Sequence, residues 1–201
     1  MIMNRAQTNR EKIKHMVVTA ILAVVIVVLQ LLCTTLATMG IIPIAPTLAL
    51  VPILVGTAMY GIGTGAFLGT VFGFIVFIVD PTAKFLMGMN LIATLVLCVA
   101  KGALAGAAAG AAYKLFSSKN RLLAIIGAGI VAPVVNTGCF VIGMLIFFKD
   151  VIFSWQTGSG HPTMLAYVIF GLCGINFIIE LIVNLALAAG IKTIITASQK
   201  Q

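Results

Sequence analysis

Residues 50–78 read LVPILVGTAMYGIGTGAFLGTVFGFIVFI and contain no charged side chain. The glycines at 61–65 predict a tight turn, which separates an apolar helix at about 47–60 from another at about 64–79. The pair Asp80-Pro81 then ends the second helix. Two uncharged apolar helices in succession are typical of a chain that is solvated by lipid.

The composition of the whole chain agrees with this interpretation. Of 201 residues, 62% are hydrophobic and 8% are charged, with a mean hydropathy of +1.23. Soluble domains have about 45–50% apolar and about 25% charged residues. A spanning helix takes about 20 residues, so the length predicts one membrane domain over 1–201 without a soluble appendage. The first apolar run continues to about residue 38 without a cleavage site, which favours a retained helix over a signal peptide.

Breakers along the chain divide it into six apolar helices. Besides the two above, we expect helices at about 16–38, 90–115, 122–148 and 163–195. Prolines make the link at 40–46 extended, and 149–163 is the longest predicted loop. The expected fold is a compact all-α bundle of six transmembrane helices.

Basic residues fall on alternate sides of these helices and set the orientation. The positive-inside rule places residues 1–15 in the cytoplasm, and six spans then bring the C-terminus to the same side. The net charge of +8 thus reflects topology and contact with anionic lipid, and no nucleic-acid partner is expected. The cytoplasmic set is Arg5, Arg10, Lys12, Lys14, Lys114, Lys119, Arg121, Lys192 and Lys200, against Lys84 and Lys149 outside.

Two helices carry glycine at every fourth position, which lines one face of each. Small-residue faces let helix backbones approach closely. Helices in lipid associate through such packing, because the hydrophobic effect does not drive their association there. Internal packing is one interpretation, and a smooth face for another membrane protein is the other. The two sets are Gly65, Gly69 and Gly73, and Gly102, Gly106 and Gly110.

Ionisable residues inside membrane helices are costly and therefore candidates for function. Glu180 lies within the last helix, with Asn176 and Asn184 one turn away on the same face. Lys101 lies near the middle of the 90–115 helix, offset from Glu180 by roughly 9 Å along the membrane normal. We expect a structural Lys101–Glu180 pair. The alternative is that Lys101 snorkels and Glu180 faces a partner helix.

Pro133, Asn136 and Thr137 place a kink and two hydrogen-bonding side chains near mid-membrane. An amide that faces a cavity offers a donor and an acceptor to a polar small molecule, whereas the alternative is an Asn bonded to a neighbouring helix. The chain has no phosphate-binding loop, no metal-ligand spacing and no catalytic set. It is therefore not expected to be an enzyme or to hydrolyse ATP itself.

Three segments resemble one transporter family. Residues 50–78 look like the signature of substrate-binding S components of energy-coupling factor (ECF) transporters. The segment VVNTGCFVIGMLIFF at 134–148 is similar to their fifth helix, and KGALAG at 101–106 is similar to the position where their fourth helix often carries a basic residue. The six expected helices, the basic N-terminus and the length fit the family as well.

The resemblance implies a vitamin-binding subunit in the cell membrane of a bacterium. Its partners would be two ATP-binding subunits, which use ATP and Mg, and a transmembrane coupling subunit. In the family the ligand lies near the outer side under the loops, and the subunit is thought to topple to release it. The first helix docks on the coupling subunit through small residues, to which Thr19, Ala20 and Ala23 are the nearest match here.

Within the family the pattern favours the pantothenate group, with pyridoxine, hydroxymethylpyrimidine or riboflavin as alternatives. Asn90, Asn136 and Thr137 would make polar contacts with the ligand, and Lys84 would pair with its carboxylate. Thr47 and Trp155 would close over it from the loops. A non-transporting membrane assembly protein and a stand-alone facilitator are rivals from other classes. The candidate substrate residues are Thr47, Lys84, Asn90, Asn136, Thr137, Trp155 and Asn176.

Overall fold

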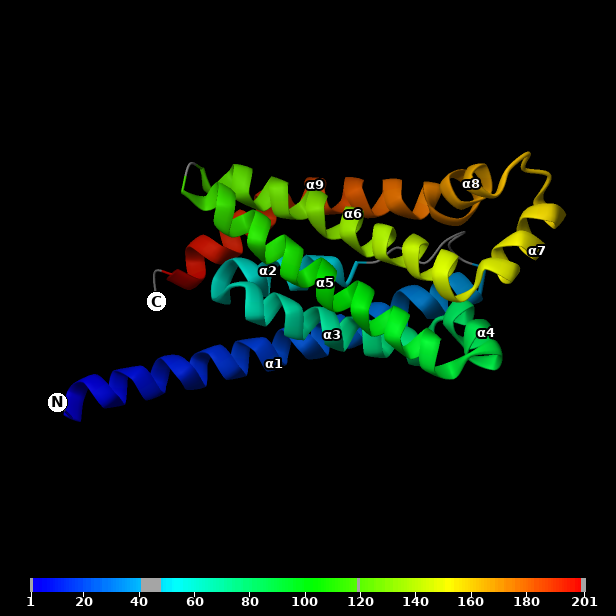
Figure 1. Cartoon of the computed structure of the whole chain (residues 1–201). Helices are drawn as coiled ribbons and strands as arrows, with labels where there is room; N and C mark the ends of the chain where they lie inside the picture. Colours follow the sequence, from blue (N-terminus) through cyan, green and yellow to red (C-terminus); the bar gives the residue numbers. More distant parts are fainter. Residues whose placement is uncertain (1, 41–47, 119, 200–201) are drawn as a thin grey trace.

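The computed structural model describes residues 2–40, 48–118 and 120–199, and in this part of the chain all regular structure is helical (Figure 1). Thr47, a candidate substrate residue, lies outside the described residues. The elements are α1 (Ile2–Thr38), α2 (Leu50–Tyr60), α3 (Ile62–Val79), α4 (Pro81–Met89), α5 (Leu91–Ser117), α6 (Arg121–Phe147), α7 (Lys149–Ser159), α8 (Met164–Ala166), the π-helix η1 (Tyr167–Cys173) and α9 (Gly174–Gln199).

The long helices run lengthwise and alternate in direction, so that the start of α1 and the end of α9 lie at the same end of the molecule (Figure 1). We call this the terminal end and the opposite one the far end. The turn between α5 and α6 lies at the terminal end, and α4 and α7 lie at the far end. Lys114 and Arg121 therefore share an end with the basic start of α1, as the charge pattern predicted.

Four of the described helices are long and apolar enough to cross a membrane. They are Asn9–Thr38, Ile62–Val79, Leu91–Ser117 and Arg121–Phe147. Two further apolar stretches, Leu50–Tyr60 and Phe177–Leu187, are shorter than a full span. The chain is thus an all-helical membrane protein.

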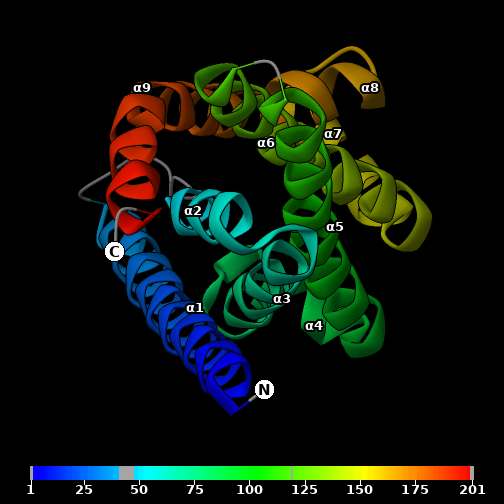
Figure 2. The ribbon, with the colours of Figure 1, turned by 90° about the vertical axis from the view of Figure 1, so that its left-hand side faces the viewer.

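The short helix α2 forms the centre of the bundle. It contacts α1, α3, α5, α6 and α9, which surround it in the end-on view (Figure 2). Its fully buried Leu50 and Ile53 belong to a core cluster with Ile26 of α1 and Leu68 and Phe72 of α3. Because α2 is covered on all sides, nearly every one of its residues is apolar or small.

The glycine faces of α3 and α5 lie against each other. A β-carbon built on Gly69 would collide with the carbonyl of Gly102, and one on Gly106 would collide with the carbonyl of Gly65. The two backbones are therefore in direct contact, which is how helices associate in lipid. The prediction of internal packing is confirmed, and neither stripe is free for another protein.

The far end contains two helices that the sequence pattern left as loops. Asp80 ends α3 and starts α4, because its carboxylate accepts a hydrogen bond from Ala83 N at 3.0 Å and Pro81 follows at the first position. The prediction of a loop over 149–163 is wrong for α7. Val151 and Ile152 are buried in a second cluster with Leu86, Leu97 and Met144, and Gly160 ends the helix at φ 74°. This burial stabilises a helix that has weak sequence signals.

The expected helices 16–38 and 163–195 also differ from the structure. α1 begins at Ile2, since its polar first turns continue the helix beyond the apolar run. The last helix is interrupted by the π-helix η1, which separates α8 from α9. Such π segments occur mostly as single turns inside α-helices, and they are frequent at functional sites.

Candidate functional site

Several polar side chains are buried inside the apolar bundle. Each would cost several kcal/mol in lipid without a hydrogen-bond partner, so a structural or functional role has to explain why polar residues occupy these positions. Gln30 donates to Thr34 on α1 at 3.2 Å, which satisfies part of one amide. The buried polar residues are Gln30, Thr34, Thr57, Thr64, Thr94, Asn136, Glu180 and Asn184.

Asn136 lies near the middle of α6 and points into the bundle. Its side chain is 6% exposed, and its Oδ1 has no hydrogen-bond partner among the residues that the structure describes. One turn earlier Pro133 lacks an N–H, so the carbonyl of Gly129 receives no helical hydrogen bond. The side chain of Asn136 therefore offers one buried acceptor to a polar partner.

α9 adds buried polar groups on the face that packs against α6. Asn184 is 2% exposed and lies beside Gly129, and neither atom of its amide has a hydrogen-bond partner within the described part of the chain. Glu180 lies one turn away and is buried as well. The predicted polar stripe thus exists for these two residues, whereas the side chain of Asn176 lies outside the described residues.

Thr137 lies on a different face of α6 from Asn136, because successive helix residues are rotated by about 100°. It lines an apolar groove of about 460 Å³ between α6, η1 and α9, with Val134, Val141, Val168 and Phe177. Asn136 is not among the residues that line this groove. The structure therefore does not bring the two adjacent candidates into one site.

Lys101 of α5 is half-buried beside α6. Its ammonium lies 4.9 Å from the centroid of the Phe140 ring, a cation–π arrangement. Both α5 and α9 pack against α6, and within the described residues no pair of α-carbons joins α5 to α9 at 8 Å or less. The Lys101–Glu180 pair stays a prediction.

The remaining substrate candidates lie at the far end. Lys84 is exposed on α4, and Asn90 is exposed at the start of α5, where its Oδ1 accepts a hydrogen bond from Ala93 N at 3.0 Å. Trp155 of α7 packs against Phe85 of α4, with ring centroids 5.4 Å apart. Asn90 thus caps a helix, and the aromatic pair joins the two short helices. Substrate contact by these residues stays a prediction.

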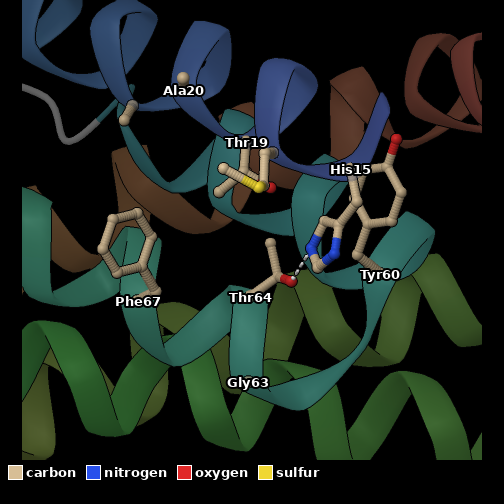
Figure 3. A pocket seen from close by; sticks show the side chains of 9 residues that line it. His15, Thr19, Ala20, Tyr60, Gly63, Thr64 and Phe67 are labelled. Carbon is tan, nitrogen blue, oxygen red and sulfur yellow. Dashed lines mark hydrogen bonds between the residues drawn. The ribbon is translucent and has the colours of Figure 1, made fainter. Parts of the chain in front are cut away.

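A second groove lies along α1 near the terminal end, and we call it the α1 groove (Figure 3). Its volume is about 700 Å³ and its walls come from α1, the end of α2 and the start of α3. The predicted docking residues Thr19, Ala20 and Ala23 all line it. The other lining residues are His15, Met16, Tyr60, Gly63, Thr64 and Phe67.

Sequence reasoning missed the polar end of the α1 groove. His15 stacks on Tyr60 with ring centroids 4.2 Å apart, and a hydrogen bond of 2.8 Å joins its Nε2 to Thr64 Oγ1 (Figure 3). His15 belongs to the polar N-terminal segment, whereas Tyr60 and Thr64 flank the glycine turn. The sequence signal that could have indicated this contact is the position of His15 at the border between the polar segment and the apolar run.

A scan against protein families places these features in one class. The family model for the substrate-specific component of ECF transporters matches residues 14–191. The chain therefore belongs to this family, and its role is that of a substrate-specific component. Searches of curated proteins and of solved structures gave no match.

Proposed function

We propose that this subunit binds a water-soluble vitamin at the far end and delivers it by docking on an ATP-driven coupling module. The observation that carries the binding step is Asn136, a buried amide with an unpartnered oxygen in the middle of a proline-containing membrane helix. A polar ligand would supply the missing hydrogen bond. Asn184 of α9, beside Gly129, is a second buried amide without a hydrogen-bond partner within the described residues, and it lies on the terminal side of Asn136.

In this proposal all six apolar helices cross the membrane, with the short α2 held inside the bundle and both termini in the cytoplasm of a bacterium. Support comes from the alternating helix directions and from the basic residues gathered at the terminal end. The far end then faces outward, where α4 and α7 enclose the ligand. Lys84 lies on α4 and Trp155 on α7, and Asn90 lies between α4 and α5.

Pantothenate is the substrate that we propose, with pyridoxine, hydroxymethylpyrimidine and riboflavin as alternatives. Its carboxylate would pair with Lys84, which is exposed on α4, and its hydroxyls and amide with Asn136. Riboflavin would need more stacking rings than the Trp155–Phe85 pair provides.

The partners in this proposal are two ATP-binding subunits, which use ATP and Mg, and a transmembrane coupling subunit. This chain hydrolyses no ATP and carries no cofactor of its own. The α1 groove supports the docking step, since it combines small residues with apolar walls and opens beside a largely exposed helix. Close approach of another membrane helix needs such a surface.

Native mass spectrometry of the gently purified protein tests the proposal. A vitamin-sized adduct together with two ATPases and a coupling protein is the expected result. A homo-oligomer without adduct would favour a membrane assembly protein, and an adduct without companion subunits would favour a stand-alone facilitator.

Two adjacent variants then locate the ligand. Asn136→Ala should weaken vitamin binding at least about tenfold, because a buried hydrogen bond is lost. Thr137→Val should leave the affinity unchanged, since Thr137 faces the groove between α6, η1 and α9. The reverse result would move the ligand to that groove and remove Asn136 from the site.

A further inference from the structure

α1 is attached to the rest of the bundle from Leu22 onward, through buried side chains that include Cys33 and Thr34, and again near the terminal end at His15. In the middle of the helix, Ile26 is fully buried and Leu22 packs against the same core cluster. Near the terminal end, His15 contacts Tyr60 and Thr64. Between these two places the outward side of α1 is bare, with Met16 70% and Val17 51% exposed.

The α1 groove lies between the two attachment points. Thr19, Ala20 and Ala23 belong to the stretch that bridges it, and His15 forms its terminal end beside Tyr60 and Thr64 (Figure 3). Thr64 is only 6% exposed and lies in the first turn of α3, whereas Tyr60 ends α2. His15 therefore ties α1 to both helices of the glycine corner at once.

The corner itself is a firm base for this contact. Gly61 turns the chain between α2 and α3 at φ 91°, a conformation that favours glycine. Gly65, one residue after Thr64, lies directly against the backbone of Gly106 in α5. A side chain held by Thr64 and Tyr60 is thus held by the most tightly packed part of the bundle.

We propose that His15, with Tyr60 and Thr64, forms a latch that positions the terminal half of α1 and so sets the shape of the α1 groove for the coupling subunit. His15 is a positioning residue, since the docking surface consists of the small residues beside it. Without the latch, α1 remains anchored only from Leu22 onward, and its small residues lose their fixed distance from α3. This inference rests on the proposed docking function.

The hydrogen bond and the stack support the latch in different ways. Threonine accepts or donates, so the bond to Thr64 forms with either neutral tautomer of His15 and with the imidazolium. The ring stack on Tyr60 adds a contact that only an aromatic side chain provides. A histidine meets both requirements, and glutamine meets only the first.

The test compares variants of the full-length subunit in nanodiscs. Docking on the purified coupling module is measured for His15→Ala, Thr64→Val, the double variant and His15→Gln. We expect His15→Ala to weaken docking by about tenfold and Thr64→Val by about fivefold, as for the loss of one or two modest contacts. The double variant should be no weaker than His15→Ala, and His15→Gln should recover part of the loss. Lys12→Ala, one turn away and exposed, is the matched control and should dock normally.

Two further measurements separate a latch from a general structural effect. Vitamin affinity of the undocked subunit should be unchanged in His15→Ala, since His15 contacts α2 and α3 near the terminal end and the proposed substrate residues lie at the middle of α6 and at the far end. Spin labels at Lys12→Cys and Ser117→Cys, in a background without the native cysteines, report the distance between α1 and the end of α5. This distance should form one narrow population when His15 is present and a broad population in His15→Ala.

A narrow distance population in His15→Ala, or additive docking losses for His15→Ala and Thr64→Val, would overturn the latch. Failure of the wild-type subunit to bind any coupling module would instead overturn the proposed function. In that case the spin distances still decide whether His15 fixes α1.

Discussion

Gly69 faces the carbonyl oxygen of Gly102 so closely that a β-carbon on Gly69 would overlap that oxygen. Both partners are backbone, so neither can move aside by changing a side-chain rotamer. Gly69→Ala should therefore push α3 and α5 apart and lower the free energy of unfolding by about 1–3 kcal/mol. Thermal unfolding in detergent measures this change.

Gly138→Ala is the matched control for this prediction. Gly138 also lies inside a long helix, but a β-carbon there meets no atom within 4 Å. Its melting temperature should be unchanged or raised, because alanine has the higher helix propensity. Equal losses in both variants would mean that the contact between α3 and α5 does not determine the effect.

Asn184 is a candidate for stabilisation by an apolar residue. Its amide is buried at 2% exposure and lacks hydrogen-bond partners in the described part of the chain. Asn184→Leu has a similar size and removes the unsatisfied groups, so we expect a gain of about 1–2 kcal/mol. A lower melting temperature, measured without vitamin, would show that the amide is satisfied in the membrane.

The proposed Lys101–Glu180 pair is testable by charge exchange. Lys101→Glu and Glu180→Lys should each reduce the amount of folded protein in the membrane, since each would place two like charges in a medium of low dielectric constant. The double exchange should restore it. Lys101→Met tests the cation–π contact with Phe140, because methionine keeps an aliphatic side chain above the ring and removes the ammonium. No rescue in the double exchange would exclude the pair.

Trp155 is the single tryptophan of the chain and reports on the far end. Phe85→Ala removes the ring that packs against it and should shift its fluorescence emission to longer wavelength as the indole gains solvent. Phe153→Ala, which removes an exposed ring from the same helix, should leave the emission unchanged. Identical spectra for Phe85→Ala and the wild type would contradict the packing of α4 against α7.

The long helices and the contact between α3 and α5 could be predicted from the sequence because both leave strong periodic signals. Apolar runs mark membrane helices, and glycine at every fourth position marks a close contact between helices. The helices α4 and α7 could not be predicted this way. Their sequences are short and mix polar with apolar residues, and they are stabilised by residues far away in the chain, such as Leu86 of α4 and Ile152 of α7, which belong to one buried cluster.

The candidate sites also differ in whether local spacing or the fold brings their residues together. Thr19, Ala20 and Ala23 line one groove, since their spacing places them on one helix face, and docking through them stays a prediction. Asn136 and Thr137 are adjacent in sequence but lie on different faces, which single-residue arguments overlook. His15 was missed because its partners, Tyr60 and Thr64, are about 50 residues away and only the fold brings them near.

The 37 residues of α1 give the helix a length of about 55 Å, whereas a bilayer core is about 30 Å thick. Roughly 25 Å of rigid rod therefore extends past the lipid, and the core anchor at Leu22 and Ile26 lies part of the way along it. A helix of this length pivots about its core contacts at Leu22 and Ile26, which lie inside the membrane. Without the His15 contacts, a rotation of about 5° at Ile26 would displace the first residues of α1, about 36 Å away, by about 3 Å.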